Sequence, residues 1–313
     1  MEIRNHMKKK IPFYSVILTF LILGLILVVW KISDKIIYNT TGLGNPIIYN
    51  YSKIYGYEIA PNQKITRLGN NININNYGMR SNVDWDKENT NAILFVGDSV
   101  TYGGSIVSND DLFTEKICEK ISYEKFICGN LSANGYGLYA INNIIKYKSF
   151  SNEKIIVIIL CGSDFIRGIN HIGSQPFWGK KIDNFFPAST ELFFIFFDKL
   201  RNKLKYNFGE KNIYSKKKIR YYKDLMKDFK KNLEQTQKPY LIFYTPELSE
   251  LNEQNSYKFF IDYMENNFQN FYNLKKEIIL EKEKIYSDNL HLNKKGHELY
   301  SEILSDKILE IIK

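Results

Sequence analysis

The residues best suited to chemistry lie in two short motifs near opposite ends of the chain. In the stretch ILFVGDSVTYGG, an apolar run leads into Gly97 and Ser99. In the stretch SDNLHLNKKG, Asp288 stands three residues before His291. A serine hydroxyl becomes an effective nucleophile only when a base takes its proton, and an imidazole oriented by a carboxylate is such a base. The two motifs therefore predict nucleophilic chemistry on an acyl group, provided that the fold brings them together.

Each motif also has a simpler interpretation. A serine after a glycine is often only a turn residue, and an Asp-x-x-His sequence can form a capped, solvated loop. The other histidines are weaker candidates for a base, because His6 precedes a long apolar segment and His171 lies in a glycine-rich loop with no acid nearby. His297 falls within a helical pattern, and we expect it to be a surface or packing residue.

Short apolar runs alternate with amphipathic stretches from residue 91 onward. The runs are rich in β-branched residues and bounded by turn residues, as in buried parallel strands. We predict an α/β fold of three layers (α/β/α), with a doubly wound parallel sheet of about five strands. Active sites of such sheets lie beyond the carboxyl ends of the strands, where Ser99 falls. The expected strands are 92–96, 126–128, 155–161, 240–244 and a weaker 277–280, and the expected helices include 216–235, 257–271 and a last helix from about Leu299 to Ile311.

The uncharged, mostly apolar segment 11–30 predicts one transmembrane helix. At 1.5 Å per residue it spans about 30 Å, the thickness of a bilayer core. Arg4 and three lysines precede it, whereas only Lys31 and Lys35 follow closely, so the positive-inside rule puts the amino terminus in the cytoplasm and the remaining chain outside. A cleaved signal peptide is the alternative, but no obvious small-residue cleavage site follows Trp30.

The region after this segment is rich in tyrosine, asparagine and glycine. The alternation NININ suggests a short strand between turns, so we expect a small β-rich segment here. The protein is thus predicted to be a single-pass protein of the cytoplasmic (inner) membrane. Its expected parts are a cytoplasmic basic tail at 1–10, a transmembrane anchor at 11–30, a stalk and small β-rich segment at 31–90, and an α/β catalytic domain at 91–313.

Charge and cysteine content exclude several classes of function. The 313 residues carry a formal net charge of +9, but the basic residues are scattered among acids, so solvated helix faces are expected and no nucleic-acid partner. The cysteines lack metal-ligand spacing, and we expect neither a metal nor a cofactor. In an oxidising compartment Cys118 and Cys128 could form a disulfide, whereas Cys161 ends an apolar run and is expected to be a buried apolar side chain.

In order and spacing, these motifs resemble those of the SGNH, or GDSL-type, esterase superfamily. Gly-Asp-Ser at 97–99 matches its first block, and Asp-x-x-His at 288–291 matches its last block. Gly135, in NLSANGYG, matches the glycine of its second block. The resemblance covers residues 91–313 and implies the flavodoxin-like fold of that family. The upstream sequences GYEIAPN and NYGMR also look similar to family sequences, with no role that can be assigned from sequence.

The resemblance implies a role for each matched residue. Ser99 would be the nucleophile, His291 its base and Asp288 the group that orients the imidazole. The oxyanion hole would consist of Ser99, Gly135 and the residue at the asparagine position of the third block. There the chain departs from the family pattern Gly-x-Asn-Asp, because Ser163 takes the place of asparagine. A serine hydroxyl is a shorter donor, and losing an oxyanion donor typically costs about 2.7–4 kcal/mol of transition-state stabilisation.

Outward-facing, membrane-anchored members of this family often act on acyl groups of cell-envelope or secreted polysaccharides. The resemblance therefore implies a serine esterase or O-acyltransferase that removes or transfers an acyl group, typically acetyl, on a glycan or another ester. Hydrolysis and transfer are not distinguished by the sequence. The departure at Ser163 keeps a second class open, namely a weakened protein of the same fold that serves as a glycan-binding or scaffold subunit.

A further apolar stretch, STELFFIFFDKLRNKL, begins at Ser189. Six consecutive apolar residues are too few to span a membrane. We expect a core-packing helix capped by Ser189. A membrane-dipping helix and an acyl-binding lid are the alternatives.

Overall fold

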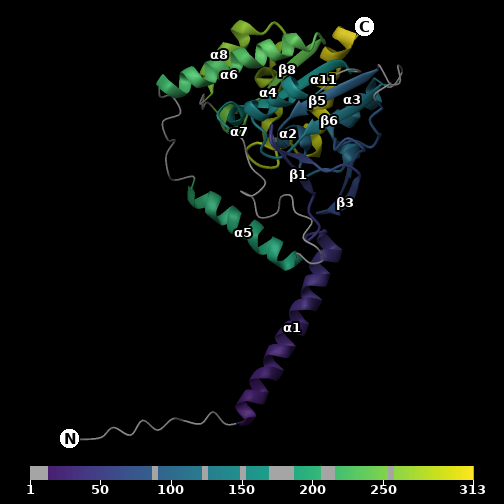
Figure 1. The fold of residues 1–313 in the computed structure, drawn as a ribbon, viewed down its shortest axis with the longest axis vertical. Coiled ribbons are helices and arrows are strands. Elements are labelled where there is room, and N and C mark those ends of the chain that lie inside the picture. Colours follow the sequence, from purple (N-terminus) through teal and green to yellow (C-terminus); the bar gives the residue numbers. More distant parts are fainter. Residues whose placement is uncertain are drawn as a thin grey trace, which may run out of the picture.

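The centre of the molecule is a five-stranded, wholly parallel sheet with the order β6-β5-β7-β8-β9 (Figure 1). The structure is a computed structural model that describes residues 13–86, 91–121, 126–148, 153–168, 187–205, 216–252 and 257–312. Its strands are β1 (Tyr49–Ser52), β2 (Gly56–Ile59), β3 (Gln63–Arg67), β4 (Asn70–Ile74), β5 (Ala92–Gly97), β6 (Ile127–Ser132), β7 (Glu153–Cys161), β8 (Tyr240–Thr245) and β9 (Phe271–Asn273).

Helices cover both faces of this sheet. The α-helices are α1 (Phe13–Thr41), α2 (Ser99–Tyr102), α3 (Phe113–Lys120), α4 (Leu138–Tyr147), α5 (Ala188–Lys205), α6 (Lys216–Gln235), α7 (Leu248–Leu251), α8 (Lys258–Asn267), α9 (Lys275–Ile278), α10 (Lys282–Ile285) and α11 (Lys294–Ile312). Three short 3-10 helices are η1 (Asn109–Asp111), η3 (Gly162–Phe165) and η5 (Ile279–Glu281).

Successive side chains of the central strand β5 enter two different apolar cores. Leu94 and Val96 pack in one core with side chains of α4, α6 and α8. Ile93 and Phe95 pack in the other with side chains of α3 and α11. All four side chains are buried, and burying one such side chain contributes about 1.5–3 kcal/mol. Because a helix layer lies on each face, the predicted three-layer α/β/α architecture is confirmed, and the strand order is the flavodoxin-like one.

In the last third of the domain, one predicted element is wrong and another is present but shorter than expected. The run 277–280, expected as the fifth strand, is helical in α9 and η5. The fifth strand is instead β9, a three-residue edge strand paired with β8. The helix expected at 257–271 ends at Asn267, because the chain must straighten there to enter β9. The helix expected at 216–235 is confirmed as α6.

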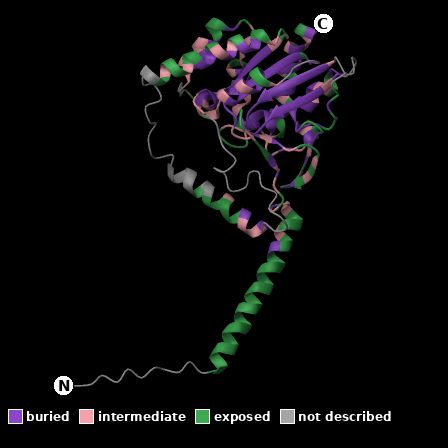
Figure 2. Cartoon of the chain, in the orientation of Figure 1, coloured by how far each residue is buried: buried purple, intermediate pink, exposed green. Residues whose placement is uncertain are grey.

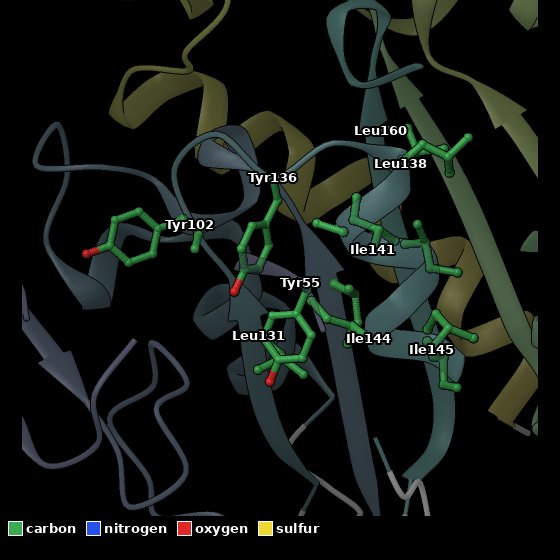
Figure 3. Close-up of a cluster of buried hydrophobic side chains, with 14 of the residues drawn as sticks. Tyr55, Tyr102, Leu131, Tyr136, Leu138, Ile141, Ile144, Ile145 and Leu160 are labelled. Atoms are coloured by element: carbon green, nitrogen blue, oxygen red, sulfur yellow. The ribbon is translucent and has the colours of Figure 1, made fainter. Parts of the chain in front are cut away.

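The β-rich segment before the α/β domain consists of two antiparallel hairpins, β1-β2 and β3-β4. Its apolar side chains are part of the core that contains α4. Tyr55 packs edge-on against Tyr136, with ring centroids 6.3 Å apart, beside the isoleucines of α4 (Figure 3). Tyr57 is fully buried in the same cluster. The hairpins are therefore packed against the α/β domain by shared apolar contacts.

The amino-terminal helix α1 projects away from the rest of the chain (Figure 1). Its side chains are exposed along most of its length, in contrast to the buried sheet (Figure 2). By length and composition α1 could cross a membrane, although a signal sequence would pass the same test. The helix continues well beyond the expected boundary at Trp30, to Thr41. The charged residues that precede the span lie outside the described residues.

A disulfide joins Cys118 in α3 to Cys128 in β6, a pairing that the sequence left open. Cys161 is a free, buried thiol, as expected. Its surroundings are more polar than expected, because its sulfur lies 3.5 Å from Oδ2 of Asp98 and 3.3 Å from Oγ of Ser163.

The prediction for the apolar stretch after residue 188 is wrong. It does form a helix, α5, but Phe193 and Phe196 are 57% and 63% exposed rather than packed in a core. Ser189 does not cap the helix, which begins one residue earlier. The cap comes from α1 instead, since Oδ1 of Asp34 accepts hydrogen bonds from the backbone N–H and the hydroxyl of Ser189 at 2.8 and 2.6 Å.

Candidate active site

The site lies at the carboxyl edge of the sheet, where the strand order reverses. β5 is the first strand of the sheet along the chain, and its neighbours are β6 and β7. The helices that follow β5 and β7 pack on opposite faces of the sheet, and ligands of open α/β sheets bind at such a switch in strand order. Ser99 follows β5 at the start of α2, and Ser163 follows β7 within η3. Asp98 caps α2, because its Oδ1 accepts the backbone N–H of Val100 at 2.8 Å.

Three side chains from the two ends of the domain form a continuous series of hydrogen bonds. Nε2 of His291 lies 2.9 Å from Oγ of Ser99. Nδ1 of the same ring lies 2.7 Å from Oδ2 of Asp288. These are the contacts that a nucleophile, its base and an orienting carboxylate require.

The chain around Asp288 is folded so that the carboxylate points at the imidazole. Oδ1 of Asp288 accepts the backbone N–H groups of Leu290 and His291, both at 2.8 Å. The backbone N–H of Ser287 donates to the carbonyl of His291 at 2.8 Å, which closes the turn. One carboxylate oxygen thus holds the loop while the other binds the ring. The three-residue offset in the sequence is what permits both contacts.

The electrostatics of this pair favour a charged imidazole next to an ionised carboxylate. Partial burial would raise the pKa of Asp288, but hydrogen bonds from the His291 ring and from two backbone N–H groups lower it to about 2. Burial would lower the pKa of His291, but its hydrogen bond to Asp288 and the charge of that carboxylate raise it above the ordinary value. Asp288 is therefore ionised at neutral pH and stabilises the imidazolium that forms when the base accepts a proton.

A buried charged cluster lies behind Ser99. Oδ2 of Asp98 is 3.5 Å and Oδ1 of Asp164 is 3.1 Å from Nη1 of Arg167. Burial and the charge of Asp98 raise the pKa of Asp164, whereas the guanidinium lowers it. Ligand-type atoms of Asp98, Cys161 and Asp164 lie within 4.8 Å of one another, a spacing that could suit a metal ion. Arg167 already supplies a positive charge to both carboxylates, so the cluster has an internal counterion.

Ser163, the departure from the family pattern, lies between this cluster and the strand ends. Nη2 of Arg167 donates to its Oγ at 3.1 Å. On another side is Glu247, which follows β8 and accepts hydrogen bonds from the backbone N–H and the hydroxyl of Ser163. Burial raises the pKa of Glu247, and these two hydrogen bonds oppose the rise. The Ser163 hydroxyl is therefore already engaged by a cation and by a carboxylate.

Gly135, the predicted second oxyanion residue, lies in the turn that follows β6. Its φ of +80° is in the left-handed region, where a residue with a Cβ would be strained. The β-rich segment holds the residues on either side of it. The hydroxyl of Tyr57 donates to the carbonyl of Asn134, and the hydroxyl of Tyr136 donates to the carbonyl of Tyr57 at 2.5 Å.

A second contact from the β-rich segment holds the loop that follows the Ser99 helix. Arg80 is fully buried, and its guanidinium donates to the carbonyls of Tyr102, Gly104 and Val107, each at 2.6 Å. Burial lowers the pKa of Arg80 to about 10, so its side chain is charged at neutral pH. The NYGMR sequence, to which we could assign no role, thus supplies the arginine that anchors this loop.

Sequence reasoning missed Tyr57, Arg80, Arg167 and Glu247. Glu247 had a usable signal, because it is a charged residue three positions beyond the predicted strand 240–244, at the edge where such sites form. Arg167 follows the third block by only a few residues, but its contact with Asp98 depends on the sheet topology. No local pattern indicates that a hairpin residue reaches the glycine loop.

His297 takes no part in the site. It is a packing residue, one of the two roles expected for it, and is stacked on Phe113 with ring centroids 5.6 Å apart. Burial lowers its pKa to about 3, so it is neutral. His6 and His171 lie outside the described residues.

No protein-family model matches the chain, and no curated protein does. Similar solved structures include a lipolytic G-D-S-L family protein from Veillonella parvula (13% identity, 67% of this chain and 94% of that chain covered, TM-score 0.36). Another is the esterase EstA from Pseudoalteromonas sp. (14% identity, 70% of this chain and 97% of that chain covered, TM-score 0.41). A third is a catalytic mutant of Axe2, an acetylxylan esterase from Geobacillus stearothermophilus (14% identity, 72% of this chain and 94% of that chain covered, TM-score 0.39). These proteins are of the class that the sequence motifs resemble. At such identities and TM-scores they do not assign an activity, which must rest on the side chains of the site.

Proposed function

We propose that the protein is a serine ester hydrolase or O-acyltransferase of the SGNH type. The observation that carries this proposal is the unbroken series of contacts from Oγ of Ser99 through the ring of His291 to Oδ2 of Asp288. Residues 192 positions apart meet at hydrogen-bond distance at the edge of the sheet where active sites form. A turn serine and a capped loop would have no reason to meet there.

In the proposed reaction, Oγ of Ser99 attacks the carbonyl carbon of an ester while Nε2 of His291 accepts the hydroxyl proton. The tetrahedral intermediate carries its negative charge on the former carbonyl oxygen, which the backbone N–H groups of Ser99 and Gly135 would stabilise together with Ser163. His291 then protonates the departing alkoxide, leaving an acyl group on Ser99. Water, or a hydroxyl of an acceptor in a transfer reaction, is deprotonated by the same imidazole and releases the acyl group.

The substrate we propose is an acylated, typically acetylated, glycan of the cell envelope or a secreted glycan. Its support is the sequence resemblance together with the partial exposure of His291 and Asp288, beside the buried Ser99. The side chains of His291 and Asp288 are 28% and 55% exposed, so within the described residues a large acceptor can approach them. An acyl group on a bulky polymer needs such an approach.

We further propose that α1 anchors the protein in the inner membrane, with the amino terminus inside and the domain from residue 91 outside. The charge asymmetry around α1 supports this orientation. A disulfide between Cys118 and Cys128 is also typical of an oxidising, extracytoplasmic compartment. Protease added to intact spheroplasts should degrade the domain after Trp30. Full protection would contradict the orientation, and a soluble product lacking residues 1–30 would indicate a cleaved signal instead.

The central test uses the purified full-length protein in detergent or vesicles, with a small aryl acetate and with acetylated glycans as substrates. Ser99→Ala should abolish turnover of both. Ser105→Ala, a change six residues further along in the same region, is the matched control and should retain the parental rate. Turnover that survives Ser99→Ala would contradict the proposed nucleophile.

A second candidate function is a glycan-binding or scaffold protein that keeps the fold. The observation that favours it is Ser163, which replaces the family's asparagine with a shorter donor and lies beside the carboxylate of Glu247, a competing acceptor for its hydroxyl. Glycan binding by the parent protein, without turnover of any acetylated substrate, would support this candidate.

A further inference from the structure

Helix α5 presents an apolar face that nothing in the described part of the chain covers. Phe193, Phe196, Phe197 and Leu200 recur at the spacing i, i+3, i+4, i+7, which places them on one side of a helix. They are 57%, 63%, 49% and 44% exposed. Exposed apolar clusters of this kind mark interaction surfaces rather than ordinary solvated helices.

The opposite side of α5 is fixed to the β-rich segment. Glu191 is only 2% exposed, and its carboxylate pairs with the guanidinium of Arg67 in β3. It also accepts the backbone N–H of Gly44 at 2.6 Å. Glu191 lies about 200° around the helix axis from Phe193, at 100° per residue. The phenylalanine face, formed by Phe193, Phe196, Phe197 and Leu200, is therefore turned away from the β-rich segment, because the buried ion pair holds the other side of the helix there.

The start of α5 is held at the outer end of the apolar part of α1. Asp34 caps the first turn through Ser189. The indole N–H of Trp30, the last residue of the uncharged segment, donates to the hydroxyl of Ser189 at 3.1 Å. Tryptophan at the end of an apolar span is typical of the membrane–water interface. From this junction α5 runs sideways instead of continuing along α1 (Figure 1).

We infer that α5 lies on the outer surface of the lipid bilayer, with its phenylalanine face among the upper acyl chains. This inference rests on the proposed membrane anchoring of α1. The apolar part of α5, Ala188–Phe197, is too short to cross a bilayer but suits a helix in the interface. The helix sequence also carries four basic residues, Lys199, Arg201, Lys203 and Lys205, against two acids, Glu191 and Asp198, which favours an anionic lipid surface. A second protein chain would not explain why the face begins at the end of the apolar span.

The test reconstitutes the full-length protein in vesicles of phosphatidylcholine and phosphatidylglycerol and attaches an environment-sensitive fluorophore to single introduced cysteines. The native disulfide is left oxidised, and Cys161 is buried. Phe196→Cys reports on α5. Phe20→Cys, 69% exposed on α1, reports on the anchor, and Leu280→Cys, 88% exposed in η5, is the matched control on the α/β domain. Lipids that carry a nitroxide near the headgroup or deep in the acyl chain serve as quenchers.

The probe at 196 should emit at shorter wavelength in vesicles and be quenched more by the shallow nitroxide than by the deep one. The probe at 20 should be quenched by the deep nitroxide, and the probe at 280 by neither. A probe at 196 that is accessible to aqueous iodide, or that is shielded from both iodide and nitroxide lipids, would overturn the inference while quenching at 20 leaves the anchor intact. Loss of quenching at 20 would instead contradict the anchor itself.

Discussion

The hydroxyl of Tyr57 donates to the carbonyl of Asn134, the residue directly before Gly135. This contact joins a hairpin of the β-rich segment to the loop that is proposed to stabilise the oxyanion. In Tyr57→Phe the ring stays in the core, but the partly buried carbonyl of Asn134 loses its donor, which costs about 0.5–1.5 kcal/mol. We expect kcat for an aryl acetate to fall several-fold with KM nearly unchanged, because the loop contacts the transition state more than the bound ester.

Tyr55→Phe is the matched control for this experiment. Its ring also packs near the glycine loop, but its hydroxyl donates to Oε2 of Glu58 at 2.6 Å, within the hairpin. It should leave kcat unchanged. Equal losses in both variants, or none in Tyr57→Phe, would mean that the hairpin contributes stability alone.

The raised pKa of His291 predicts the pH dependence of the reaction. The imidazole must be neutral to accept the Ser99 proton, so kcat/KM should rise with pH and level off above the pKa of the free enzyme. Since Asp288 raises that pKa above the ordinary 6.5, the midpoint should lie above 6.5. In Asp288→Asn the raising carboxylate is gone, so the midpoint of the small residual activity should move to lower pH. An unchanged midpoint would show that another group is titrating.

Ser163 allows the oxyanion contact to be tested directly. If its hydroxyl donates to the developing charge, Ser163→Ala should lower kcat and kcat/KM together by about tenfold or more with little change in KM. Glu247→Gln removes the charge that competes for this hydroxyl, so it should hold or raise kcat. Ser163→Asn restores the family's amide donor and should also hold or raise kcat if the longer side chain fits. An alanine variant as fast as the parent would make Ser163 a structural turn residue.

The disulfide between Cys118 and Cys128 closes a short loop between α3 and β6. Its sequence separation of 10 corresponds to about 2–3 kcal/mol of stabilisation from reduced chain entropy in the unfolded state. Thermal unfolding should therefore occur at lower temperature after reduction by dithiothreitol. The double variant Cys118→Ser/Cys128→Ser should match the reduced parent and be insensitive to the reductant. An unchanged unfolding temperature would mean that the link contributes little.

The central strands could be predicted from sequence because each is a continuous apolar run buried on both faces. The fifth strand could not. Ile278 is buried, but Leu280 is 88% exposed, so the apolar run that suggested a strand belongs to a one-sided helical turn. The real edge strand, Phe271–Asn273, is short and only partly buried, and therefore carries no apolar run. Burial on both faces is what makes a strand visible in a sequence.

The residues of the candidate site also divide into those that the sequence could predict and those that it could not. Asp288 and His291 could be paired from sequence because they share one turn, and Ser99 from its place at the end of a strand. Arg167 and Glu247 reach the site from separate crossovers, so their contacts follow from the order of strands in the sheet. For α5, an amphipathic pattern predicts that one face is apolar but not what covers it.

Because α1 continues as a helix beyond Trp30, it sets the distance between the end of the apolar segment and the rest of the protein. Residues 31–41 extend the helix by about 16 Å at 1.5 Å per residue, and its end is joined to the β-rich segment by the hydrogen bond from the backbone N–H of Leu68 to the carbonyl of Thr41. With α1 in the bilayer as proposed, the triad would be carried at a constant stand-off from the lipid surface. The protein would then find substrate by lateral diffusion in the plane of the membrane, and acyl groups at one height above it would be within reach while those on more distant polymer would not.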